Sequence, residues 1–550
     1  MANYRGKTPL AQLSEETLRQ MVQETPPAGK KRGVISLTVL AALGSLVFGY
    51  DIGVISGALP YMCMPYGAGG MRITPAQEGA IGGILPLGAA FGALLGGRLS
   101  DRYGRKHAMI PLTVLFVVGT LGNAFAPHIW VMYPFLLILG FAIGATSAIV
   151  PVFLAESAPQ RIRGTILAVN QLMIVTGLLL AFSMNAIINF CYGGPRIIVK
   201  SDPAGVVKTG EYSWDTLNRL VANHLGSDDV QKVHDFLSNM VIAGGNGTAW
   251  RWMVVACSAP AIAMWLGMQL IPESSRWYLL QQEVYAAIGS LKRVRDPKKD
   301  GDLAIELLEM VQARQRQGLG KKATFREVIG TPWLRKLMFV GIFLAIVNQT
   351  TGVNTVLYYA PKVLNVAGMG SSAAIFAQVA NGLMSVVGSA IGLILITKFR
   401  RRTILIWDVA LVGISLLGIA LVFQFAITPH ISDSAVPAWA GYLVLALMSI
   451  FLLVVQSSNG TVVWTMLGEM FPADVRGIMN GTAIFCMWIV SAFITWSFPP
   501  MVAALGPGPT YALYGVLNLI IAVVLFKIMP ETSGRSLEEI ESYMQHIYSK

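Results

Sequence analysis

Twelve apolar segments dominate this chain of 550 residues and constrain its fold more than any other feature. Each is roughly 20 residues or longer, the length that an α-helix needs to cross a bilayer. Over the whole chain 54% of the residues are hydrophobic and 13% are charged, which is typical of a membrane protein with many spans. We therefore predict an all-α polytopic membrane protein, with spans near residues 34–59, 78–98, 107–126, 130–152, 165–190, 251–271, 337–364, 372–397, 403–426, 438–467, 478–502 and 509–529.

Two long polar connections divide these spans. The first, 191–249, is predicted to be an outer insert with a short helix near 226–242. The second is strongly charged and helical in pattern, and it separates two sets of six spans. We expect a cytoplasmic N-terminal segment (1–33), a six-helix bundle that includes the insert (34–271), a cytoplasmic helical linker (272–336), a second six-helix bundle (337–529) and a cytoplasmic C-terminal tail (530–550).

The distribution of Lys and Arg predicts the orientation. With both termini inside, 33 of the 41 basic residues fall in inner segments and eight fall in outer ones. Positive charge accumulates on the cytoplasmic side of membrane proteins, so the reverse orientation is disfavoured. The net charge of +12 therefore reflects topology and does not indicate a nucleic-acid partner. We expect a multi-pass protein of the plasma membrane with both termini cytoplasmic.

Three short motifs occur once in each half of the chain, in the same order. The pattern E-x-x-P-x-x-x-R-G begins at Glu156 after the fourth span and again at Glu469 after the tenth. A basic cluster follows the second span and the eighth. A Pro-Glu pair follows the sixth span, at Glu273, and the twelfth, at Glu531. Repeats in matching order predict two pseudo-symmetric halves.

Residues 345–360, inside the seventh span, combine spanning length with an unusual polar content. The stretch carries amide, hydroxyl and phenol groups, and Gly352 lies near its centre, where a helix can break beside a ligand. Uncharged polar groups are costly in hydrocarbon unless they face protein or a wet cavity. Amides suit a neutral polyhydroxylated ligand because each one both donates and accepts. Polar contacts between helices are the alternative interpretation.

Acidic and basic residues recur together at the inner ends of the spans. Arginine favours bidentate contact with a carboxylate, so such pairs can hold one arrangement of two moving halves and release in another. Plain topology signals are the alternative for any single residue, but the repeated arrangement favours a charge network at an inner gate. Its predicted members are Arg98, Asp101, Arg105, Glu156, Arg163, Glu273, Arg276, Arg401, Glu469, Arg476 and Glu531.

These motifs resemble those of a known family. Residues 97–106, Gly-Arg-Leu-Ser-Asp-Arg-Tyr-Gly-Arg-Lys, are similar to the loop-two signature of the major facilitator superfamily. Residues 272–277 and 530–535 resemble two signatures of its sugar porter family, and residues 349–359 resemble the seventh-span sugar motif of that family. The likeness extends over about residues 34–545 and is strongest to bacterial myo-inositol/proton symporters, for instance at 331–335.

The resemblance implies the major facilitator fold, with a substrate cavity at mid-membrane between the halves. Carried over position by position, its lining residues are Gln171, Asn348, Gln349, Asn354, Tyr358, Asn381, Trp464 and Trp488. Amides can hold hydroxyl groups, and an indole offers a sugar ring an apolar platform with one N–H donor. Leu178 and Met487 stand where some members have glutamine, so this cavity is less polar than the family pattern.

Asp51 places a carboxylate deep in the first span. By resemblance, this is where proton-coupled members carry their proton site; a neutral, hydrogen-bonded structural aspartate is the alternative. Those members pair the aspartate with an arginine in span four, but Leu136 stands at that position and 107–160 contains no Lys or Arg. Burial without a cation favours the protonated form of a carboxyl group and makes proton release harder.

Together these features predict a secondary transporter that imports a neutral monosaccharide or cyclic polyol, either myo-inositol or a hexose or pentose, by alternating access. Proton symport through Asp51 is expected. Facilitated uniport is the alternative, because of Leu136. A non-transporting sugar sensor is a rival of another class, suggested by the insert and the charged linker.

An enzyme is not expected. The sequence contains no G-x-x-x-x-G-K-[ST] loop, and its six histidines form no metal motif, so neither a cofactor nor a metal is predicted. Four cysteines, Cys63, Cys191, Cys257 and Cys486, are expected to be free thiols. We expect a monomer whose partners are a small sugar or polyol, protons and the bilayer.

Overall fold

The computed structural model describes residues 13–29, 34–159, 163–226, 230–295, 302–319, 325–430, 436–472, 475–532 and 537–549. Twelve helical spans within these ranges are long and apolar enough to cross a membrane, which confirms the predicted all-α architecture. The first six are formed by α2 (Val34–Met62), α3 (Pro75–Tyr103), α4 (Arg105–Phe125), α5 (Ile129–Ser157), α6 (Arg163–Tyr192), and α9 (Ala249–Ala256) with α10 (Ser258–Leu270). The second six are formed by α15 (Pro332–Thr350) with α16 (Val353–Val366), α17 (Ser371–Lys398), α18 (Arg401–Val422), α19 (Ala438–Ser458) with α20 (Trp464–Glu469), α21 (Arg476–Leu505) and α22 (Pro507–Ile528).

Local sequence signals fix where several of these helices begin. Thr74 and Gln77 form a capping box at the start of α3, in which each side chain accepts a hydrogen bond from the backbone N–H of the other, and Pro75 fits the first helical position. Gly104 has a φ of 101°, a conformation that residues with a side chain rarely adopt. It lets the chain turn directly from α3 into α4.

The sixth span is divided at Cys257 between α9 and α10, and the seventh and tenth spans are also interrupted. The seventh breaks at Gly352, whose φ is +78°, so that α15 ends at Thr350 and α16 starts at Val353. The tenth contains a π-helical turn, η6 (Asn459–Val463), between α19 and α20. Such turns are rare inside helices and often mark functional sites. The sequence predicted the interruption at Gly352 and not the one at η6.

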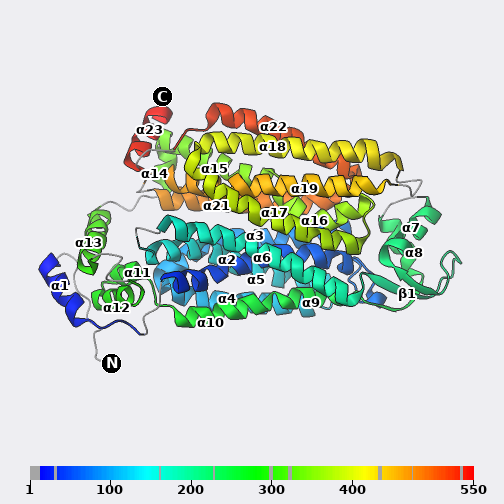
Figure 1. Cartoon of the computed structure of the whole chain (residues 1–550), viewed down its shortest axis with the longest axis horizontal. Helices are drawn as coiled ribbons and strands as arrows, with labels where there is room; N and C mark the ends of the chain where they lie inside the picture. Colours follow the sequence, from blue (N-terminus) through cyan, green and yellow to red (C-terminus); the bar gives the residue numbers. More distant parts are fainter. Residues whose placement is uncertain are drawn as a thin grey trace.

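The spans form two bundles that lie side by side along their length (Figure 1). The blue-to-green helices of the first half lie below the yellow-to-red helices of the second half in that view. Across the boundary α3 packs against α21, α6 against α17, and α16 against α2. The first and last described helices, α1 (Glu15–Glu24) and α23 (Leu537–Ser549), lie at one end of the bundle, which we call the terminal end; β1, α7 and α8 lie at the other, the insert end (Figure 1).

The insert is more structured than the sequence suggested. The expected helix near 226–242 corresponds to α8 (Val230–Ser238), and it is accompanied by α7 (Trp214–Leu225) and a three-stranded antiparallel sheet of order β2-β1-β3. Its strands are β1 (Arg196–Ser201), β2 (Gly210–Ser213) and β3 (Val241–Gly245), with Arg196 opposite Ser213 and Ile197 opposite Gly245. Alternate residues of β1, Ile197 and Val199, are fully buried, the period-two pattern of a half-buried strand.

The terminal end carries a separate group of short helices. These are α1 (Glu15–Glu24), α11 (Ser275–Leu280), α12 (Val284–Val294) and α13 (Leu303–Leu319). They share a small apolar cluster to which Leu18, Ile288 and Leu307 contribute. Two further helices, α14 (Phe325–Gly330) and α23 (Leu537–Ser549), pack against α15. The first segment, the linker and the tail therefore gather at the same end of the bundle.

Candidate functional site

The helix break at Gly352 brings three side-chain amides together. Asn348 and Gln349 lie in the last turn of α15, and Asn354 lies in the first turn of α16. The Gln349 amide donates to Asn348 Oδ1 at 2.7 Å, and the Asn354 amide donates to Gln349 Oε1 at 3.0 Å and to Ser491 Oγ of α21 at 2.9 Å. We call Asn348, Gln349 and Asn354 the amide cluster.

The π-helical turn of the tenth span holds one side of the amide cluster. The Asn459 side chain donates to the backbone carbonyl of Asn348 at 3.0 Å, and the Asn348 side chain donates to the carbonyl of Asn459 at 3.4 Å. Gln171 reaches the same turn from the first half: a Cβ atom added to Gly460 would lie 2.7 Å from Gln171 Nε2. Gln171 of span five and Asn348 of span seven therefore both lie next to η6.

Trp488 adds an aromatic wall beside the cluster. It lies one turn before Ser491 on α21 and is 7% exposed. Its ring makes an edge-to-face contact with Phe48 of the first half, with the ring centroids 5.9 Å apart. Among the described residues its indole N–H has no hydrogen-bond partner. A buried donor of this kind normally finds an acceptor, so this one is available to a ligand.

Three predicted binding residues lie away from these contacts. Asn381 has no exposed surface, and its side chain is hydrogen-bonded to Gln378 at 2.7 Å and to Ser449 at 2.8 Å. Tyr358 is buried with its ring centroid 6.1 Å from that of Tyr359. Trp464 begins α20 and is 40% exposed. Their place in the binding site stays a prediction.

Asp51 lies in the middle of α2 and is 2% exposed. Within the described part of the chain, its Oδ2 atom has no hydrogen-bond partner. Leu136 of α5 is equally buried, so the position of the missing arginine is filled by an apolar side chain.

At the terminal end, the same group of three side chains occurs in each half. In the first half, Arg105 forms ion pairs with Asp101 at 2.9 Å and with Glu156 at 3.0 Å, and the Ser274 hydroxyl donates to Glu156. In the second, an ion pair joins Arg401 to Glu469, and Arg401 also donates to the Thr532 hydroxyl at 3.3 Å. The repeated motifs of the sequence therefore fold into repeated arginine–glutamate–hydroxyl groups.

The glutamates of the two Pro-Glu motifs bind helix N-termini. Glu273 is buried and accepts hydrogen bonds from the backbone N–H groups of Arg105, Lys106 and His107 at 2.9–3.3 Å, at the start of α4. Glu531 accepts from the N–H of Arg402 at 3.3 Å, at the start of α18. A carboxylate is stabilised there by the unpaired N–H groups and by the helix dipole.

The other predicted members of the charge network are placed as follows. Arg98 and Arg276 are exposed. The Arg476 guanidinium donates to the carbonyl of Phe471 at 3.0 Å. The side chain of Arg163 lies outside the described residues. Whether these residues act in a gate stays a prediction.

At the insert end, polar contacts join the two halves directly. Lys362 of α16 forms an ion pair with Glu78 of α3, and Asn189 of α6 donates to the hydroxyl of Ser372 on α17 at 2.7 Å. The insert takes part, because Asp215 of α7 accepts from the side chain of Asn365 at 2.9 Å and from the N–H of Ser371 at 2.7 Å. This end of the bundle is closed by contacts between side chains of both halves and of the insert.

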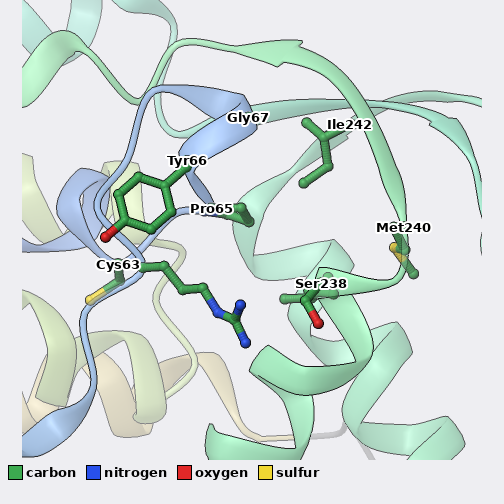
Figure 2. A pocket seen from close by; sticks show the side chains of 9 residues that line it. Cys63, Pro65, Tyr66, Gly67, Ser238, Met240 and Ile242 are labelled. Carbon is green, nitrogen blue, oxygen red and sulfur yellow. The ribbon is translucent and has the colours of Figure 1, made fainter. Parts of the chain in front are cut away.

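A cavity of about 250 Å³ lies between the end of α2 and the insert (Figure 2). Its lining includes Tyr66 and Cys63 from the first half and Ser238, Met240 and Ile242 from the insert. All four cysteines of the chain are free, as expected. The cavity belongs to the insert end and not to the amide cluster.

The comparisons with known proteins identify the family. The profile of the family described as "Sugar (and other) transporter" matches residues 37–201 and 236–543. The chain belongs to this sugar transporter family. It is therefore a membrane transporter and not an enzyme, as the sequence predicted.

Relatives match more than nine-tenths of this chain. A putative metabolite transport protein of Bacillus subtilis, YncC, is 36% identical and is covered over 96% of its length by 94% of this chain. The major myo-inositol transporter IolT of the same organism is 33% identical, with 92% of this chain and 93% of IolT covered. The fold is similar to that of the xylose transporter XylE from Escherichia coli in a partially occluded inward-open conformation, with a TM-score of 0.69, 24% identity, and 92% and 99% of the two chains covered.

Sequence reasoning missed the polar partners that hold the amide cluster. Asn459 and Ser491 were not named, although each contacts it directly. A signal was present for Asn459, because residues 456–461 of the tenth span read Gln-Ser-Ser-Asn-Gly-Thr and meet the criterion that singled out the seventh. Ser491 is a lone hydroxyl in an apolar helix, and only the fold shows what it contacts.

Proposed function

We propose that this sugar transporter imports a neutral monosaccharide or cyclic polyol, and that the amide cluster recognises its hydroxyl groups. The observation that carries the proposal is the unused hydrogen-bonding capacity of buried groups beside a helix break. Asn348 and Gln349 each use one of their two N–H donors in the hydrogen bonds described above, and the Trp488 indole N–H uses none among the described residues. Neutral donors beside an aromatic face fit a hydroxylated ring.

Named relatives support a sugar or polyol as the substrate. Besides the myo-inositol transporter, they include a D-xylose transporter of Levilactobacillus brevis, 30% identical, and the galactose-proton symporter of Escherichia coli, 29% identical. These substrates are all neutral and carry several hydroxyl groups. We favour myo-inositol, since the transporter named for it is the more similar of these relatives.

For the energy source, we propose proton symport with Asp51 as the proton-binding group. Asp51 is buried and has an unpartnered oxygen within the described structure. Leu136 in place of an arginine favours the second candidate, uncoupled uniport. Alternating access would open the terminal end and the insert end in turn, with the arginine–glutamate groups at the inner gate.

We also propose that the protein acts as a monomer in the plasma membrane with its terminal end in the cytoplasm. The support is the excess of Lys and Arg in the segments at that end. The insert then faces outward, where it covers the outer ends of α6, α16 and α17.

Transport by the purified full-length chain in proteoliposomes tests the proposal. Labelled myo-inositol, glucose and xylose are offered with an inward proton gradient, with and without a protonophore. We expect one of them to accumulate and the protonophore to abolish the accumulation. Uptake that only equilibrates the sugar, and that the protonophore does not change, would establish uniport. Accumulation against the sugar gradient in the presence of the protonophore would exclude proton symport. Binding without flux would instead indicate a sensor.

A further inference from the structure

A second buried carboxylate, Asp408, lies in the second half and has no part in the function proposed above. It is 3% exposed and lies in α18, about 10 Å along the helix axis from Arg401 at the terminal end. Among the described residues neither of its carboxylate oxygens has a hydrogen-bond partner. An ionisable group inside a membrane span is expensive and marks a functional site by default.

The surroundings of Asp408 favour a neutral acid over a charged one. Its neighbours on α18, Leu405 and Val409, are fully buried in the same apolar cluster as Val462 and Val463 of η6. Leaving an ionised carboxylate in such a place without a cation costs several kcal/mol. Protonation removes that charge, and the acid then needs a single hydrogen-bond acceptor.

The elements packed against α18 bring no cation to Asp408 within the described structure. They are α17, α19, α22, η4 (Phe423–Ile427) and η6. Their Lys and Arg residues are Lys398, the last residue of α17, and Lys527, in the last turn of α22. On α18 itself, Arg401 is paired with Glu469, and Arg402 donates to the carbonyl of Phe526.

Ser458 supplies the acceptor that a protonated Asp408 requires. It is the last residue of α19, is 2% exposed, and lies beside Asp408. Its hydroxyl oxygen, like the two carboxylate oxygens, lacks a hydrogen-bond partner in the part of the chain that is described. A sodium ion would need several oxygen ligands, whereas a proton needs one donor atom and one acceptor.

Ser458 is also joined to the amide cluster. The next residue, Asn459, opens the π-helical turn and exchanges two hydrogen bonds with Asn348. Asn348 is bonded to Gln349, and Gln349 to Asn354. A movement of η6 that follows a change of charge at Asp408 therefore acts directly on the groups proposed to bind the sugar. Coupling between two sites needs a connected series of contacts that can adopt two arrangements. The hydrogen bonds that run from Asn459 to Asn354 provide such a series of contacts.

We propose that Asp408 and Ser458 form a proton-binding site coupled to substrate binding through η6. The inference rests on the proposed transport function and deepens it. With a proton bound, the Asp408 carboxyl can donate to the Ser458 hydroxyl, whose oxygen has no partner in the described structure. When the terminal end opens to water, the proton leaves to water and the carboxylate remains, with no other bond made or broken. By linkage, a proton that raises affinity for the sugar is itself bound more tightly when sugar is present.

The test compares Asp408→Asn with the unaltered full chain in proteoliposomes, using the sugar that the uptake panel selects and the internal pH dye pyranine. We expect Asp408→Asn to lose sugar-driven proton entry and accumulation against the gradient. Counterflow of labelled for unlabelled sugar, which needs no net proton movement, should persist. Glu16→Gln, an exposed acid-to-amide change in α1, serves as the control and should retain all three activities. Infrared difference spectra should lose a protonated-carboxyl band in Asp408→Asn.

Several results would overturn the site. Full proton-coupled accumulation in Asp408→Asn would show that Asp408 binds no transported proton. Accumulation that depends on sodium would show that the site binds a metal cation and not a proton. Asp408→Leu is a second variant that tests for misfolding, because leucine fills the apolar site without a polar group. Loss of counterflow in both variants would show that Asp408 has a structural role. If the unaltered chain shows no sugar flux, the proposed function itself fails.

Discussion

At the scale of single residues, the candidate site consists of side chains that hydrogen-bond to one another and still have unused N–H donors. Gln349 is the central member, since it donates to Asn348 and accepts from Asn354 across the helix break. It therefore orients its neighbours, and under the proposed function it also contacts the ligand. A substitution of Gln349 therefore tests both roles together.

We expect Gln349→Ala to abolish measurable uptake. The change removes the proposed ligand contact, leaves Asn348 Oδ1 without the N–H of Gln349, and takes away one of the two acceptors of the Asn354 amide, at a combined cost of about 3 kcal/mol, or on the order of 100-fold in affinity. Sugar binding measured by calorimetry and uptake in proteoliposomes check this. Gln20→Ala, at an exposed position of α1, is the matched control. Near-normal affinity in Gln349→Ala would remove the amide cluster from the binding site.

At the scale of secondary-structure elements, most of the spans could be predicted because their apolar length determines them. The eighth span was expected at 372–397 and is Ser371–Lys398. The break at Gly352 was predictable because glycine is permissive and polar residues surround it. The π-helical turn at Asn459 was not, since hydrogen bonds to Asn348, 111 residues earlier, help to hold it. Likewise the insert sheet pairs β1 with β3 about 45 residues later, a register that no local pattern specifies.

The break between α15 and α16 should depend on the left-handed conformation of Gly352. A Cβ atom there meets nothing closer than 3.5 Å, so the cost of Gly352→Ala comes from its φ of +78° and not from a clash. We expect a loss of about 1–2 kcal/mol of stability and weaker sugar binding, because Gln349 and Asn354 are displaced. Thermal unfolding and uptake measure the two effects.

Gly481→Ala is the control for this element. Gly481 lies inside α21, and a Cβ atom there would meet nothing within 4 Å. In a regular helix alanine is more favourable than glycine by up to about 1 kcal/mol, so this variant should be as stable as the unaltered chain or more so. Equal behaviour of the two variants would show that the conformation of Gly352 is not required.

At the scale of the whole molecule, the sequence repeat predicted two related halves but not which ends touch. The arginine–glutamate groups at the terminal end lie within one half each, around Arg105 and around Arg401. The ion pair between Glu78 and Lys362 instead crosses from one half to the other at the insert end. Neither residue belongs to a recognised motif, and the contact exists only in an arrangement with this end closed. Under the proposed alternating access, this ion pair would break when the insert end opens.

The two partners of this ion pair should respond unequally to substitution. Glu78 is 2% exposed, whereas the Lys362 side chain is 35% exposed and can reach water. Lys362→Met leaves the buried Glu78 carboxylate without its cation, which costs about 3–5 kcal/mol and favours opening of the insert end. Glu78→Gln leaves only the partly exposed Lys362 ammonium without its partner and should cost less. The double variant, Glu78→Gln with Lys362→Met, removes both charges and should recover most of the closed population.

Distances between spin labels at the insert end measure these populations. Labels are attached through Tyr66→Cys in the first half and Trp439→Cys in the second, both exposed positions, in a chain whose native cysteines are replaced. The distance should lengthen most in Lys362→Met, less in Glu78→Gln, and return toward the starting value in the double variant. If all four proteins gave one distance, the ion pair would be a passive contact and the outer closure would depend on Asn189 and Asp215 instead.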